Sequence, residues 1–234
     1  MRTDAGPYGG EDVTRESFRA ELEDLREAVA DLGRTVTERF ERAAAALAEG
    51  DEAAARAVIE GDAEINERYL ELESRCIDLF ALQQPVAGDL RFVAASFKII
   101  TDLERVGDLA TNLAGRALEK REEYRPDVNV ADLTDIAAEM LERAVDAYEA
   151  DDPELCHAVA DQDDELDGLC ERVAGLVIED LVGMECGRAV DDDLMAGVRR
   201  LLLTVRDVER VGDHAVNVAA RTLYMTRGSE ALLY

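Results

Sequence analysis

Residues 102–116 read D-L-E-R-V-G-D-L-A-T-N-L-A-G-R, and residues 207–221 read D-V-E-R-V-G-D-H-A-V-N-V-A-A-R. The two stretches lie 105 residues apart and are identical at ten of fifteen positions. A weaker match aligns residues 62–66 with residues 163–167, at an offset of 101. Repeats at a spacing of about half the chain indicate two copies of one structural unit.

The composition is that of a helical protein. Trp is absent, Pro occurs 4 times in 234 residues, and Ala, Leu, Val, Glu, Asp and Arg dominate. Apolar residues recur at helical spacing between a few breaks, which fall at Gly50-Asp51, at Pro85, at residues 124–129 and at Pro153. The expected helices cover residues 14–49, 52–81, 86–123, 130–150, 154–183 and 191–227.

The repeat and the breaks together predict an all-α fold of two tandem three-helix bundles, six long helices related by an internal repeat. The first bundle is expected to span residues 14–123 and the second residues 130–228. Residues 1–13 contain a proline and three glycines without apolar periodicity, and are expected to form a flexible tail.

Each motif places carboxylates and an amide at i, i+4 and i+8, which on a helix form one narrow stripe opposite the apolar face. Like charges at this spacing repel, so a stripe that occurs twice suggests a counter-charge, and a metal ion is the simplest one. The stripes consist of Glu104, Asp108 and Asn112 in the first copy and Glu209, Asp213 and Asn217 in the second.

Two further pairs with i, i+4 spacing are expected on the middle helix of each bundle, where they could meet the stripes. They are Asp62 with Asn66 and Asp163 with Asp167. Four to six oxygen ligands would favour a hard or borderline cation such as Mg²⁺, Mn²⁺ or iron. The alternative is that all these side chains are a solvated acidic surface.

The net charge of −28 argues against nucleic acid as a direct ligand. Only two lysines occur, and an acidic, lysine-poor surface is expected of a protein that works in concentrated salt, so a halophilic source is a hypothesis. The sequence has no run of eighteen apolar residues and no apolar core of a signal peptide. A cytoplasmic protein without membrane insertion is therefore expected.

Nothing in the sequence pairs a nucleophile with its base, so we expect no enzyme. Of the two histidines, His214 lacks the E-x-x-H spacing of ferritin-like di-iron centres, and His157 gives a single copy with Glu154, where such a centre needs one on each of two helices. Gly107 and Gly212 interrupt otherwise strong helices at a cost of about 1 kcal/mol each. Close helix packing or the approach of a ligand would explain both glycines.

Residues 84–93, Q-P-V-A-G-D-L-R-F-V, and residues 98–114, K-I-I-T-D-L-E-R-V-G-D-L-A-T-N-L-A, closely resemble the PhoU family of phosphate-uptake regulators. The second motif and the tandem arrangement resemble that family as well, over about residues 14–228. The resemblance implies two similar three-helix bundles, in agreement with the fold predicted above.

The resemblance also implies a regulator without catalysis of its own. The partners that it implies are the ATPase subunit of a Pst-type phosphate ABC transporter and, in bacteria, a sensor histidine kinase. A homodimer is expected. PhoU-like proteins carry E(D)-x-x-x-D motifs that bind iron, zinc or magnesium. Three pairs match that motif: Glu104/Asp108, Glu209/Asp213 and Asp163/Asp167. The pair Asp62/Asn66 departs from it.

Two alternatives stay open, a helical interaction protein without metal and a metal-dependent hydrolase.

Overall fold

The computed structural model describes residues 9–82, 87–119, 129–184, 192–229 and 231–232. All regular structure in these ranges is α-helical, which confirms the predicted fold class. The helices are α1 (Gly9–Glu49), α2 (Glu52–Glu60), α3 (Asp62–Leu82), α4 (Ala87–Ala117), α5 (Val130–Ala150), α6 (Pro153–Met184) and α7 (Asp192–Arg227).

Gly61 divides the helix predicted over residues 52–81 into α2 and α3, so the prediction of one continuous helix was wrong here. Arg39 from α1 donates a hydrogen bond to the carbonyl of Gly61 and pairs with Glu64 at 3.2 Å. A side chain at position 61 would collide with this guanidinium, since its Cβ would lie 2.9 Å from Arg39 Nη1. The break between α2 and α3 therefore lies where Arg39 packs against the backbone of Gly61.

Repeat-related aspartates begin the middle helix of each bundle. Asp51 accepts hydrogen bonds from the backbone amides of Ala53 and Ala54, and Asp152 accepts them from the amides of Glu154 and Leu155. These contacts satisfy amides that have no partner within a helix. Proline 153 is the first residue of α6, where it loses no helical hydrogen bond. In the first bundle α1 already begins at Gly9, so residues 9–13 of the predicted tail are helical.

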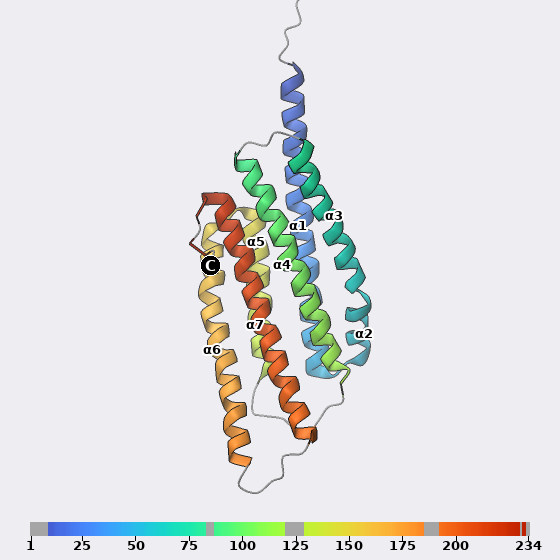
Figure 1. The fold of residues 1–234 in the computed structure, drawn as a ribbon, viewed down its shortest axis with the longest axis vertical. Coiled ribbons are helices and arrows are strands. Elements are labelled where there is room, and N and C mark those ends of the chain that lie inside the picture. The colour runs from blue at the N-terminus through green and yellow to red at the C-terminus, as the bar shows by residue number, and fades with distance from the viewer. Residues whose placement is uncertain (1–8, 83–86, 120–128, 185–191, 230, 233–234) are drawn as a thin grey trace, which may run out of the picture.

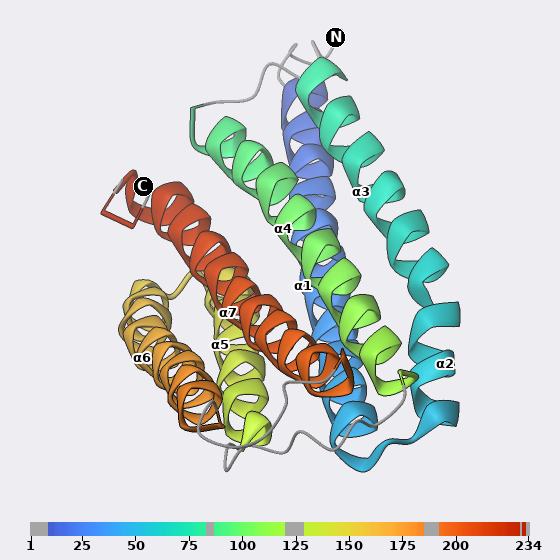
Figure 2. The ribbon, with the colours of Figure 1, turned by 60° about the horizontal axis from the view of Figure 1, so that its bottom comes forward.

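The two bundles pack side by side, with α4 of the first antiparallel to α7 of the second (Figure 1). Behind this pair α1 packs against α5, while α2–α3 and α6 lie on the two outer sides (Figure 2). Buried side chains from both bundles form one core, to which Phe40, Ile100 and Tyr148 contribute. The hydroxyl groups of Tyr148 and Ser96 lie 2.8 Å apart across the bundles. Both bundles therefore share their interior.

The predicted linker lies almost wholly outside the described residues, of which only Asn129 belongs to it; Asn129 caps α5. None of the described helices is long and apolar enough to span a membrane.

Candidate metal-binding carboxylate clusters

The first predicted stripe meets the middle helix of its bundle. We call Asp62 on α3 with Glu104 and Asp108 on α4 the α3–α4 cluster. Asp62 is fixed by two donors: Thr111 Oγ1 donates to its Oδ1 at 3.1 Å, and Asn66 Nδ2 donates to its Oδ2 at 3.0 Å. Asn66 thus supports the carboxylate next to it.

Burial and mutual repulsion raise the pKa values of the two α4 acids of this cluster, Glu104 and Asp108. Burial raises the pKa of Glu104, and the charges of Asp108 and Asp62 raise it further. Burial likewise raises the pKa of Asp108, with a further increase from Asp62. The cluster therefore holds negative charge that its protein neighbours do not fully compensate.

The second bundle repeats this arrangement with four carboxylates. We call Asp163 and Asp167 on α6 with Glu209 and Asp213 on α7 the α6–α7 cluster. Burial raises the pKa of Asp163 to about 6, and its three partners in the cluster, together with Asp164, add to the shift. Burial and neighbouring acids also raise the pKa values of Asp167 and Glu209.

The glycine in each motif lets the middle helix approach the last one. A Cβ on Gly212 would lie 2.6 Å from Leu166 Cδ2 and 3.1 Å from Asp163 Oδ1. A Cβ on Gly107 would lie 3.0 Å from Ile65 Cδ1, the equivalent contact in the first bundle. The predicted close packing is confirmed at both positions, and the same glycine brings Asp163 against α7.

The two motif asparagines differ in their surroundings. Asn112 is exposed on α4. Asn217 Nδ2 donates to Asp102 Oδ1 at 3.3 Å, across the junction of α7 with α4. Their roles as metal ligands stay predictions.

The sequence reading did not single out the residues that join the two bundles beside these clusters. Asp102 and Asp207 open the two motifs, and both are buried at the junction of α4 with α7. Asp102 bonds to His214, and Asp207 pairs with Arg116. Both aspartates stand at the same position of the repeat, and this recurrence could have marked them as important. The spacing of residues within one helix, however, does not predict a partner on the other bundle.

The donor chemistry of the clusters fits a hard cation, because the acids offer several carboxylate oxygens in one place. One of these oxygens, Asp163 Oδ1, is buried and has no hydrogen-bond partner in the described part of the chain. Among the residues that the structure describes, however, no three His, Cys, Asp or Glu side chains are already arranged to hold an ion. A bound metal would therefore require side-chain rotation within the cluster.

The family of the PhoU domain matches residues 29–117 and 130–222, one match for each bundle. The chain belongs to the PhoU family. The phosphate-specific transport system accessory protein PhoU homolog of Pseudomonas putida is 33% identical over 220 residues, which is 92% of this chain and 82% of that protein. The phosphate-specific transport system accessory protein PhoU homolog 1 of Methanothermobacter thermautotrophicus is 31% identical over 211 residues, which is 89% of this chain and 93% of that protein.

Solved structures agree with this membership. The crystal structure of PhoU from Pseudomonas aeruginosa has a TM-score of 0.83 and 31% identity, over 91% of this chain and 100% of that one. The crystal structure of the phosphate transport system regulatory protein PhoU from Streptococcus pneumoniae has a TM-score of 0.79 and 26% identity, over 92% of this chain and 99% of that one. The relatives are accessory or regulatory proteins of phosphate transport systems, and the predicted family and fold are confirmed.

Proposed function

We propose that this PhoU-family protein regulates phosphate uptake and phosphate homeostasis as a metal-binding adaptor that negatively modulates a Pst-type phosphate ABC transporter and the associated signalling. Its proposed partners are the ATPase subunit of the transporter and, in a source that has one, a sensor histidine kinase. Family membership supports the regulatory part. The observation that carries the metal part is the recurrence of a carboxylate cluster at equivalent positions of both bundles.

In this proposal each cluster holds its ion between the middle and last helices. In the second bundle, Asp163, Asp167, Glu209 and Asp213 are the proposed ligands. In the first, Glu104 and Asp108 act with Asp62 and Asn66, a weaker set because an amide replaces one carboxylate. Iron, zinc, magnesium and manganese are all candidates. A bound cation would supply positive charge to acids that repel one another, and would connect two helices of the same bundle.

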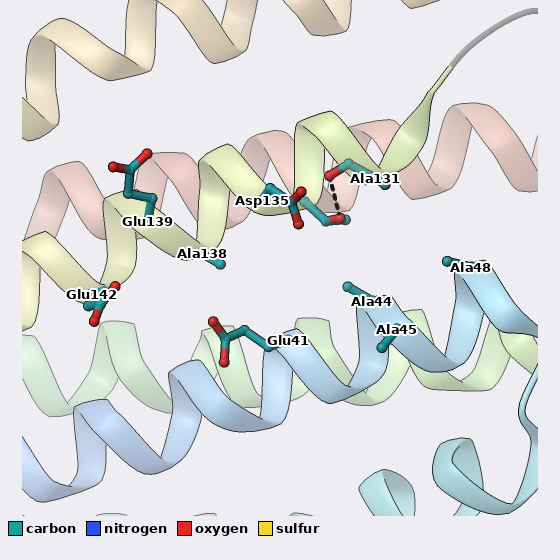
Figure 3. A pocket seen from close by; sticks show the side chains of 10 residues that line it. Glu41, Ala44, Ala45, Ala48, Ala131, Asp135, Ala138, Glu139 and Glu142 are labelled. Carbon is teal, nitrogen blue, oxygen red and sulfur yellow. Dashed lines mark hydrogen bonds between the residues drawn. The ribbon is translucent and has the colours of Figure 1, made fainter.

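Metal content tests the first half of the proposal. Protein purified in high salt without chelator or a metal-affinity tag should contain stoichiometric metal, and Glu104→Gln with Glu209→Gln should lose it while keeping its helicity. Glu41→Gln with Glu142→Gln is the matched control. These two carboxylates line a groove of about 410 Å³ between α1 and α5, on helices that carry neither cluster (Figure 3). The control removes the same charge and should keep the metal.

Phosphate uptake tests the second half. Cells that lack this protein should continue to import phosphate when phosphate is plentiful, and the wild-type chain should restore repression. If the Glu104→Gln, Glu209→Gln variant is folded but fails to repress, metal and regulation are linked. Full repression by a metal-free variant would remove metal from the mechanism.

The second candidate is a helical interaction protein without metal function, whose acids are an adaptation to salt. It is favoured by the net charge of −28 and by the absence, in the described residues, of carboxylates already arranged around an ion. Background metal content in the wild-type protein would support this alternative.

A further inference from the structure

The stripe that carries the acids of each motif continues toward the start of its helix as apolar side chains, three of which are exposed. Residues at i, i+7, i+14 and i+18 lie close to one line along a helix. On α4 this line contains Leu90, Phe97, Glu104 and Asp108, and on α7 it contains Met195, Leu202, Glu209 and Asp213. The order is the same in both copies: two apolar residues, followed by two acids.

Three of the four apolar residues on these lines are exposed, and Phe97, the counterpart of Leu202, packs partly buried against the core. Leu90 is 45% exposed and its counterpart Met195 is 46% exposed, while Leu202 is 37% exposed. Exposed leucine or methionine at one site needs no explanation, but exposure at the same place in two diverged copies does. At the start of α7 the side chains line a groove of about 520 Å³, with Asp192 and Arg199 among its residues.

The neighbouring middle helix also carries exposed apolar side chains, beyond its acids in the chain. On α6, Ile178 follows the cluster residue Asp167 by three turns and is 60% exposed, and Val182 one turn further on is 64% exposed. Ile77 on α3, the counterpart of Ile178, is 52% exposed. By helical spacing Ile178 lies in line with Asp167, and Met195 and Leu202 lie in line with Glu209, beyond the acids that meet in the α6–α7 cluster. We call these three exposed residues, together with Val182, the apolar tip.

We propose that the apolar tip binds an amphipathic helix of a partner protein, and that a lysine or arginine on this helix lies against the α6–α7 cluster. The apolar residues of the partner would fill the groove beside Met195 and Leu202. Its basic group would reach the cluster two turns away, where Asp163 Oδ1 has no donor among the described residues. Helix-in-groove recognition uses this combination of apolar anchors and a polar end.

Charge decides in favour of a protein partner over a lipid surface. A chain with a net charge of −28 is repelled by anionic phospholipids, and the acids beside the tip repel their headgroups. A basic amphipathic helix meets both halves of the surface with complementary chemistry. The proposed docking does not require a metal. A cation in the cluster would compete with the basic group and weaken docking.

The probe is a fluorescent 18-residue peptide of leucine and lysine with leucines at i, i+4 and i+7, titrated into the full chain in the presence of chelator. A peptide of the same composition in scrambled order controls for attraction to an acidic protein. Substitution Leu202→Gln should weaken binding of the amphipathic peptide about tenfold, because loss of an anchor residue in a docking groove has an effect of this order. The matched control is Leu70→Gln, an equally neutral change at a residue of α3 that is 58% exposed.

Equal affinity for the two peptides, or equal loss in Leu202→Gln and Leu70→Gln, would overturn the proposal. So would binding to vesicles of anionic phospholipid that Leu202→Gln abolishes while leaving peptide binding intact. Because the titration is done without metal, its failure is separate from a failure of the metal analysis. Equal unfolding free energies of the two variants would show that Leu202→Gln acts on binding.

Discussion

His214 on α7 and Asp102 on α4 form a buried hydrogen bond across the junction of the two bundles, with 2.9 Å between Nδ1 and Oδ1. Asn217 donates to the same oxygen at 3.3 Å. The other motif aspartate, Asp207, pairs with Arg116 on the opposite bundle. The first residue of each motif therefore contacts the other bundle, while the acids two and six residues later form the cluster of its own bundle.

Substitution of His214 by leucine, which stands at the equivalent position 109, should destabilise the protein by about 1–3 kcal/mol. The carboxylate of Asp102 would lose its principal donor while staying buried, and leucine offers none. Urea unfolding measures the change. Adding Asp102→Leu to this variant should restore part of the lost stability, because both polar groups are then gone. A His214→Leu protein as stable as wild type would mean that the bond contributes nothing.

Gly212→Ala should destabilise by about 1–3 kcal/mol, since a well-packed contact accepts an extra methyl group only by moving its neighbours. The methyl would meet Leu166 Cδ2 at 2.6 Å. The control is Gly115→Ala on α4, where a Cβ meets nothing within 4 Å and where the second copy already has Ala220. This change should stabilise the helix by up to about 1 kcal/mol. Thermal unfolding of the two variants should therefore shift in opposite directions.

The sequence predicted local structure well because the fold is built from long helices with regular apolar spacing. The meeting of Asp163 and Asp167 with Glu209 and Asp213 also followed from it, because middle and last helices of a bundle are neighbours. The break at Gly61 did not, since it depends on Arg39 from another helix. The partners of Asp102 and Asp207 lie on the other bundle, and no pattern within one helix encodes how two bundles pack.

Salt should stabilise this protein. The free energy of unfolding is expected to rise between low and multimolar NaCl, because screening reduces the self-repulsion of a chain with a net charge of −28. Circular dichroism at increasing urea, repeated at several salt concentrations, measures the effect. Glu41→Gln with Glu142→Gln should be less dependent on salt than wild type. Equal stability at all salt concentrations would count against the halophilic origin that the composition suggests.

Stability without metal should rise as the pH falls from about 7 toward 4, through the pKa of Asp163. Burial and the acids of the α6–α7 cluster raise this pKa to about 6 in the folded protein, above the usual value of 3.8. Between these values the folded chain binds a proton that the unfolded chain does not, so each step down in pH favours folding. Above about pH 6 the ionised group carries its full unfavourable cost, and below 3.8 both states are protonated.

Asp163→Asn should remove this part of the pH dependence. Asp161→Asn, which changes an exposed aspartate two residues earlier on α6, should retain it. Metal should reverse the trend, because a cation needs the deprotonated carboxylate and its affinity therefore falls as the pH drops below 6. Urea midpoints at pH 4 to 7, with chelator and with added Mn²⁺, measure both slopes. If Asp163→Asn and Asp161→Asn followed the same pH curve in chelator, the raised pKa of Asp163 could not be its source.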